Sequence, residues 1–191
     1  MTEIAFERWP KTPRLFDSKG VVITEKIDGT NACVIITEDG QIGAQSRNRL
    51  LPMGPRGMDD VSWQKEDNAG FAAWVRENRD GLVDELGPGR HFGEWWGWKI
   101  GRGYGLSEGD RRFWLFNTDK WGHLAEPPSG VPGLGVMPVL YNGPYALLAV
   151  EVALLDLALY GSKAAPGWDR PEGVCLYHRS ASRIFKALID K

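Results

Sequence analysis

The sequence has few cysteines, no excess of charge of one sign and no long uninterrupted apolar run. Cys33 and Cys175 lie in apolar stretches without a CxxC or Cys/His spacing, which argues against a zinc site and favours a reduced, cytoplasmic protein. The formal net charge of −2 excludes a whole-molecule field that attracts nucleic acid, so any phosphate binding must come from a local cleft. The first ten residues lack the apolar core of a signal peptide.

The most apolar stretch covers residues 144–161. It contains Glu151 and Asp156 and is too short to span a bilayer comfortably, so we expect no membrane contact. Pro144 at its start and Gly161 just past its end are typical helix boundaries. The pattern therefore predicts a buried helix.

The 191 residues, 42% of them hydrophobic and nine of them tryptophan, suffice for a real core. We find no repeat or low-complexity linker, which favours a single domain over residues 1–191. Helical spacing of apolar residues predicts a helix over 71–86, and loops are expected at 50–67 and 126–138. Strands are predicted at 21–27, 31–37, up to Ser46, and at 90–98, 111–117, 172–178 and 182–189. Short antiparallel-looking strands with two substantial helices favour an α+β fold.

Residues 24–35, "TEKIDGTNACVI", place Lys26 at the end of a predicted buried strand. An ammonium ion is poorly tolerated there, whereas a lysine that must lose its proton and attack an electrophile suits such a setting. A free lysine has a pKa of about 10.4, and burial or a neighbouring cation can lower the pKa of such an amine. The alternative is a strand-end lysine whose ammonium reaches solvent. The KxDG pattern alone is weak, because it occurs by chance.

Five segments in order strengthen the catalytic interpretation: "EKIDGTN", "QSRNR", "FGEWWG", "FWLFN" and "PEGVCLYH…RIFKAL". This set resembles the covalent nucleotidyltransferase superfamily of polynucleotide ligases and mRNA capping enzymes. In detail it is similar to RNA ligases of the phage T4 RNA ligase 2 type, especially their short, single-domain phage and bacterial relatives. The resemblance covers nearly the whole chain.

The resemblance implies a nucleotidyltransferase (ATP-grasp-like) domain of antiparallel sheets flanked by helices, with an ATP cleft between them and no C-terminal OB or RNA-binding domain. It implies ATP-dependent RNA ligation through a lysyl-AMP intermediate on Lys26, with ATP as the AMP donor and Mg²⁺ or Mn²⁺ as the metal. The expected substrate is RNA with 5′-phosphate and 3′-hydroxyl ends. An accessory RNA-binding protein is an expected partner, because the net charge is −2 and no basic tail is present.

The resemblance also assigns roles on the nucleotide side. Lys26 is the expected nucleophile, and Glu25 is expected to read the adenine amino edge. Glu94 is expected to hold the ribose hydroxyl and Phe116 to stack on adenine, while Arg47 contacts ribose, phosphate and the RNA end. Thr24, Ile27 and Asn31 complete the expected ATP-binding set on this strand and turn.

Three further residues come from the last motifs. Glu172 is expected to support the catalytic metal, and Val174 to lie against the base. Lys186 is expected to neutralise the α-phosphate as charge develops in the transition state. Mg²⁺ keeps most of its waters, so one or two carboxylates with the ATP phosphates suffice for a site.

Some positions depart from the family pattern or remain open. Asn117 replaces the aspartate that usually follows the stacking phenylalanine, and Ile184 replaces the first lysine of a KxK pattern. Asp28 suits either a turn or a metal-bound water. The "GRGYG" segment at residues 101–105 lacks the GxxxxGK[ST] spacing of a Walker loop.

Two alternative functions remain. The first is an ATP-dependent DNA ligase or another nucleotidyltransferase, against which stands Asn31, where those enzymes usually carry arginine. The second is a non-catalytic nucleotide- or RNA-binding module of the same fold. The intact Lys26, Glu94, Glu172 and Lys186 argue against it.

Overall fold

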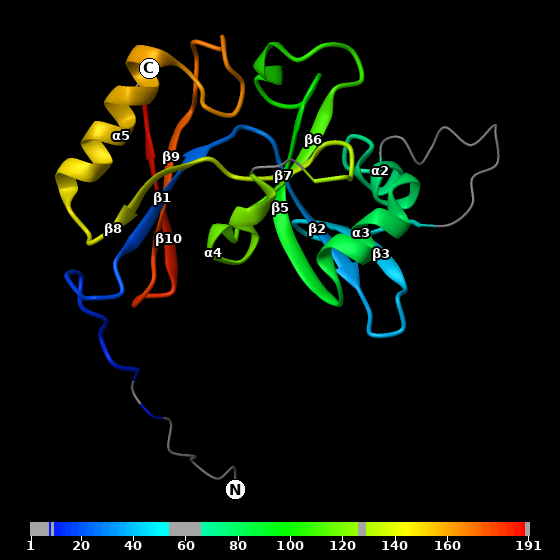
Figure 1. The fold of residues 1–191 in the computed structure, drawn as a ribbon, viewed down its shortest axis with the longest axis horizontal. Coiled ribbons are helices and arrows are strands. Elements are labelled where there is room, and N and C mark those ends of the chain that lie inside the picture. Colours follow the sequence, from blue (N-terminus) through cyan, green and yellow to red (C-terminus); the bar gives the residue numbers. More distant parts are fainter. Residues whose placement is uncertain (1–7, 9, 54–65, 126–128, 190–191) are drawn as a thin grey trace, which may run out of the picture.

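Two β-sheets form the framework of the computed structural model, which describes residues 8, 10–53, 66–125 and 129–189 (Figure 1). The first has four strands in the order β10–β9–β1–β8, and the second has six in the order β4–β3–β2–β5–β6–β7. All pairs are antiparallel except β6–β7. The strands are β1 (Val21–Lys26), β2 (Thr30–Ile36), β3 (Ile42–Ser46), β4 (Leu50–Leu51), β5 (Gly89–Gly97), β6 (Arg111–Leu115), β7 (Leu134–Val136), β8 (Val139–Gly143), β9 (Gly173–His178) and β10 (Arg183–Leu188).

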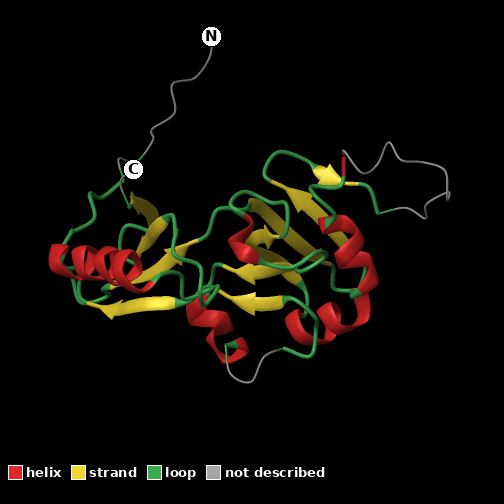
Figure 2. Ribbon diagram, turned by 90° about the horizontal axis from the view of Figure 1, so that it is seen from above, coloured by secondary structure: helices red, strands yellow, loops and turns green. Residues whose placement is uncertain are grey.

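Each sheet packs its own helices on one face, and Figure 2 shows the two sheets as separate groups of strands. Helices α2 (Phe71–Glu77) and α3 (Arg79–Leu86) cover the six-stranded sheet, and α5 (Leu147–Tyr160) covers the four-stranded one. A third hydrophobic cluster connects the two sheets. It includes Ile27, which follows β1, Trp96 on β5 and Tyr104. The α+β class and the antiparallel sheets flanked by helices are confirmed.

The helix predicted over 71–86 is broken in two at Asn78. This residue has φ −107° and ψ 21°, outside the helical region, and its side-chain amide donates to the carbonyl of Trp74. Asparagine competes with helix formation in this way, because its short side chain bonds to nearby backbone groups. Both halves still bury their apolar residues against the sheet.

The prediction of a buried helix over 144–161 is wrong in one respect. The helix α5 forms, but it begins at Leu147, and only Ala153 and Leu157 are fully buried. Its other face exposes large apolar side chains, namely Leu147, Leu148, Val152, Leu155, Leu159 and Tyr160. An all-apolar sequence predicts a helix covered on every side, whereas here the sheet covers one side only.

Several short elements fall where no regular structure was predicted. Strand β4 lies in the expected loop 50–67, whose residues 54–65 are outside the described part of the chain, and β7 lies in the expected loop 126–138. Strand β8, helix α4 (Thr118–Trp121) and the 3₁₀ turns η1 (Gly103–Gly105) and η2 (Gly122–Leu124) were not expected either. These segments are too short to show a hydrophobic period, and tertiary pairing forms them. None of the described helices has the length and apolar character needed to cross a membrane.

The packing of α5 generates a paired stability prediction. Leu157 is 0% exposed and Leu155 is 57% exposed on the same helix. We expect Leu157→Ala to lower the free energy of unfolding by about 2–5 kcal/mol, because it leaves a cavity under the helix. Leu155→Ala should change it by less than about 1 kcal/mol. Urea unfolding of both variants measures this, and equal losses would contradict the assignment of the two faces.

Candidate active site

The centre of the site is an ion pair between the end of one strand and the start of another. Lys26 is the last residue of β1, and Glu172 directly precedes β9. The register pairs Lys26 with Gly173, and the Lys26 Nζ lies 2.5 Å from the Glu172 Oε2. Their side chains are 21% and 16% exposed, so the pair is partly withdrawn from water but still reachable. The two main predicted catalytic residues are therefore in direct contact.

Two glycines allow the backbone to close around this pair. A Cβ on Gly173 would lie 2.2 Å from the carbonyl oxygen of Ala187, and its φ of +149° is itself unfavourable for other residues. A Cβ on Gly29 would lie 2.5 Å from the carbonyl oxygen of Trp95 on β5. Gly29 of the KxDG pattern therefore lets the chain after Lys26 approach β5 of the second sheet closely, in addition to favouring a turn.

The second sheet contributes Glu94 from β5. Its Oε1 accepts the backbone N–H of Gly29 at 3.2 Å, and its Oε2 accepts the side-chain amide of Asn31 at 3.4 Å. Burial raises the pKa of Glu94 to about 7, although the charge of Lys26 and the Gly29 N–H act in the opposite direction. The charges of Glu172 and Asp28 add to the increase. The electrostatic effects of these groups on Glu94 show that residues of both sheets meet here.

The glycine-rich segment 101–105 makes side-chain contacts with the backbone on both sides of the Lys26–Glu172 pair. The Arg102 Nη1 donates to the carbonyls of Arg170 at 2.9 Å and Pro171 at 3.2 Å, and its Nε lies 3.5 Å from the Asp28 Oδ2. The Tyr104 hydroxyl accepts the backbone N–H of Asp28 at 2.8 Å. One segment therefore fixes the chain just after Lys26 and just before Glu172. Sequence reasoning missed this role, because the segment matches no phosphate-binding motif.

The register of the four-stranded sheet corrects the role predicted for Val174. This residue is fully buried in the cluster beneath α5, on the face away from Lys26. Its neighbour Cys175 pairs with Thr24 on one side and Lys186 on the other. Directly paired residues share a face, and alternate residues of β1 do so too, so Thr24, Cys175 and Lys186 lie on the face of Lys26. Cys175 is the residue of β9 that faces the site.

Glu25 is a buried anchor of the loop that follows α5. It is 1% exposed, and its Oε1 accepts the hydroxyl of Ser162 at 2.6 Å. Its Oε2 accepts the backbone N–H groups of Lys163 at 2.8 Å and Ala164 at 2.9 Å. Burial raises the pKa of Glu25, and these hydrogen bonds oppose the increase. Because both oxygens already accept hydrogen bonds, the predicted contact with adenine would have to share them.

The other residues predicted to contact the nucleotide differ in how deeply they are buried. Ile27 is buried in the cluster between the sheets, and Phe116 packs against the same cluster. Arg47 is exposed just after β3. The Asn117 Oδ1 accepts the backbone N–H of Lys120 and so caps α4, which is the function that this departure from the family pattern has in the fold.

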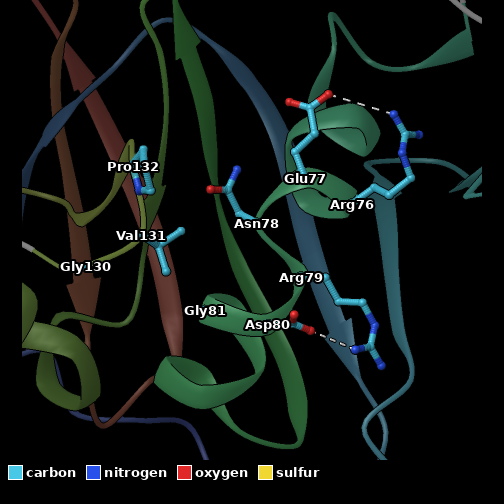
Figure 3. Close-up of a pocket in the computed structure, with 9 residues that line it drawn as sticks. All are labelled: Arg76, Glu77, Asn78, Arg79, Asp80, Gly81, Gly130, Val131 and Pro132. Carbon is cyan, nitrogen blue, oxygen red and sulfur yellow. Dashed lines mark hydrogen bonds and ion pairs between the residues drawn. The ribbon is translucent and has the colours of Figure 1, made fainter.

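Two surface hollows lie among the described residues, and one of them borders the site. The hollow in Figure 3, about 370 Å³, lies at the break between α2 and α3 and contains none of the predicted site residues. Its lining consists of residues 76–81 and 130–132. A second hollow of about 660 Å³ borders the site, with Asp28, Arg102 and Pro171 in its wall.

A divalent metal fits this donor set only together with a substrate. The described residues contain no group of three or more histidine, cysteine or carboxylate side chains arranged to hold a metal ion. Glu172 is a single accessible carboxylate beside Lys26. Mg²⁺ is bound by one or two carboxylates with substrate phosphates and water, so Glu172 fits such a site when a nucleotide supplies the remaining oxygens.

Known proteins share the family and the fold of this chain. A family model described as RNA ligase matches residues 19–188. A mutant of Naegleria gruberi RNA ligase solved with ATP and Mn has a TM-score of 0.57 at 20% identity, covering 90% of this chain and 50% of that chain. An apo mutant gives 0.58 at 18%, and a mutant with AMP and Mn gives 0.56 at 19%, with the same coverage. No curated protein matches the sequence. The chain therefore shares the fold of these structures and spans about half their length.

The environment of Glu94 generates a pH prediction. A carboxyl group whose pKa is raised on folding stabilises the protein in its neutral form, and this contribution is lost as the pH rises through the folded pKa of about 7. We expect the free energy of unfolding of the wild type, relative to Glu94→Gln, to fall by about 1–3 kcal/mol between pH 4.5 and pH 8. Urea titrations of both proteins across this range measure it. A difference that does not change with pH would contradict the raised pKa.

Proposed function

This chain belongs to the RNA ligase family, and we propose that it is an ATP-dependent RNA ligase that joins a 3′-hydroxyl to a 5′-phosphate through a lysyl-AMP intermediate on Lys26. The observation that carries the proposal is the contact between Lys26 and Glu172, with Glu94 of the second sheet close enough to respond to both charges. A surface lysine has no need of such a setting, whereas a nucleophile next to a metal-binding carboxylate does.

The first step is attack of the Lys26 Nζ on the α-phosphate of ATP. The ammonium loses one proton to solvent before the attack. A nitrogen–phosphorus bond then forms, the bond to the leaving pyrophosphate breaks, and a second proton leaves the nitrogen for solvent, so the lysyl-AMP keeps one N–H. The sequence suggested a neighbouring cation as the activating group, but the structure places the carboxylate of Glu172 on the amine. The Lys26 Nζ donates a hydrogen bond to Glu172, so it must leave this contact before the nitrogen can attack the α-phosphate.

Glu172 is the residue we propose to hold a divalent metal, which when bound neutralises charge on the ATP phosphates. A Glu172 oxygen that binds a metal ion holds the Lys26 amine less tightly. Metal binding by Glu172 would therefore also release Lys26 for attack. Lys186 lies on the same face of the sheet, on β10, two strands away from β1. Its ammonium suits the negative charge that develops on the α-phosphate.

The later steps use the same face. AMP passes from Lys26 to the RNA 5′-phosphate, and the 3′-hydroxyl then attacks that phosphate and displaces AMP. Arg47, exposed after β3, is the predicted contact for the RNA end, because a guanidinium binds phosphate through two donors. A DNA ligase and a non-catalytic module remain the alternatives. The family match favours the RNA ligase over the DNA ligase, and the Lys26–Glu172 contact argues against the non-catalytic module.

The test of this proposal is covalent labelling by α-labelled ATP with Mg²⁺ or Mn²⁺. We expect the wild type to be labelled and Lys26→Ala not to be, because no other group replaces the nucleophile. Glu172→Gln should reduce labelling by about 10²–10³-fold, since one contact that stabilises a transferring phosphoryl group has this effect.

Lys19→Ala is the matched control, because Lys19 is an exposed lysine in the loop before β1. Its labelling should equal that of the wild type. Undiminished labelling of Lys26→Ala would refute the assignment of the nucleophile, and incubation of the labelled protein with 5′-phosphate and 3′-hydroxyl RNA tests the joining steps.

The clamp made by Arg102 generates a second activity prediction. Arg102→Ala should lower the rate constant of self-adenylation by about 10–100-fold with little change in the KM for ATP, because misplacing Glu172 relative to Lys26 affects the reacting geometry. Arg102→Lys should recover only part of this, because lysine lacks the planar fork. The control is Arg170→Ala, whose side chain is 73% exposed. Equal rates in the Arg102→Ala and Arg170→Ala variants would rule out the positioning role.

A further inference from the structure

The face of the six-stranded sheet that carries Glu94 continues beyond the site as an open surface. The register pairs Asn31 with Glu94, Cys33 with Phe92 and Ile35 with Arg90, and it pairs Cys33 with Gln45 on the other side. Alternate residues of a strand share a face, so Arg90, Phe92 and Glu94 form one line along β5. The opposite face is the one that packs against the core with α2.

An aromatic side chain lies exposed in the middle of this line. Phe92 is 52% exposed, although its chain neighbours His91 and Gly93 are both buried. The small side chain of Cys33 lies directly opposite and is buried. A phenylalanine in this position is accessible to a flat ligand and is carried by the central strands of a sheet, so its position is well defined.

Two arginines accompany the aromatic ring. Arg90 is exposed, and its Nη1 donates to the Oε1 of Gln45 on β3 at 2.8 Å, which orients the guanidinium across the sheet. Arg47 is exposed in the turn between β3 and β4, two residues after Gln45. Of the ion pairs formed within the described part of the chain, none involves Arg47 or Arg90. Both charges are thus free to meet an anion, in a protein whose net charge is −2.

We propose that this surface, formed by Arg47, Arg90 and Phe92, binds single-stranded RNA next to the ends that are joined. A base stacks on Phe92, and phosphates contact the arginines, which is the chemistry by which sheets bind unpaired nucleotides. Along β5, Phe92 lies about 7 Å and Arg90 about 14 Å from Glu94, so the surface is continuous with the site within a few nucleotides. This inference rests on the proposed function, because it names where the RNA of that reaction lies.

The experiment is fluorescence anisotropy of a 5′-labelled, unstructured oligoribonucleotide with the full chain at 50, 100 and 200 mM salt. Phe92→Ala should weaken the affinity by about tenfold, since stacking of one base on an aromatic side chain has this effect, and Phe92→Trp should retain it. Arg90→Gln should reduce the slope of log affinity against log salt by about 0.7, which corresponds to the loss of one phosphate contact.

The chain offers matched controls for both changes. Phe185→Ala removes a phenylalanine of similar exposure from β10, where it lies on the face that carries α5. Arg79→Gln removes an exposed arginine from α3. Equal RNA affinity of Phe92→Ala and Phe185→Ala, or equal salt slopes of Arg90→Gln and Arg79→Gln, would overturn the proposal. Thermal unfolding of each variant shows that a loss of binding is not a loss of fold.

Self-adenylation, measured on the same samples, separates this inference from the proposed function. A wild type that binds RNA through Phe92 but is not labelled by ATP would refute the ligase and leave the RNA surface in place. A wild type that is labelled, with RNA binding that does not depend on Phe92, would refute the surface and leave the ligase in place.

Discussion

The contact between Lys26 and Glu172 is the constraint on which the rest of the site depends. A lysine and a glutamate 2.5 Å apart and mostly withdrawn from water are stable only as partners, because either charge alone would be costly to bury. The pairing of β1 with β9 brings their backbones together, Gly173 allows the close approach, and Arg102 ties the two flanking segments to each other. The proposed reaction requires this pair to separate, and the pair is held by a single side-chain contact.

Three glutamates near Lys26 show how environment divides one residue type into different roles. Glu25 is fully buried and orders the loop after α5 through three hydrogen bonds. Glu94 is half-buried and has longer hydrogen bonds, to Gly29 and Asn31, and its pKa of about 7 lets it change protonation near neutral pH. Glu172 is accessible and paired with the lysine, which leaves it available to a cation. Their order in the sequence does not reveal this division.

Within the described part of the chain, the face that carries Glu94 extends the site along β5. The cluster that contains Ile27, Trp96 and Tyr104 covers the Glu94 face at the Trp96 end of β5. Towards Phe92, on the other side of Glu94, the face stays open. The outer face of α5 is also open and apolar, but it belongs to the opposite side of the four-stranded sheet from Lys26. The surface around Phe92 therefore lies on the same sheet face as Glu94, whereas the apolar face of α5 does not lie on the face of Lys26.

The sequence by itself determined the fold class and most strand positions, because these depend on local periodicity. Its short motifs also singled out Lys26, Glu94, Glu172 and Lys186 as candidate site residues, but only the structure showed that Lys26 contacts Glu172. It could not decide that α5 is covered on one side only, that Asn78 breaks a helix, or that "GRGYG" is a clamp. Only the tertiary structure decided that Cys175, and not Val174, faces the site. The physical reason is that side chains alternate along a strand, so a shift of one residue exchanges the two faces, and only strand pairing and the packing of α5 set which face is buried.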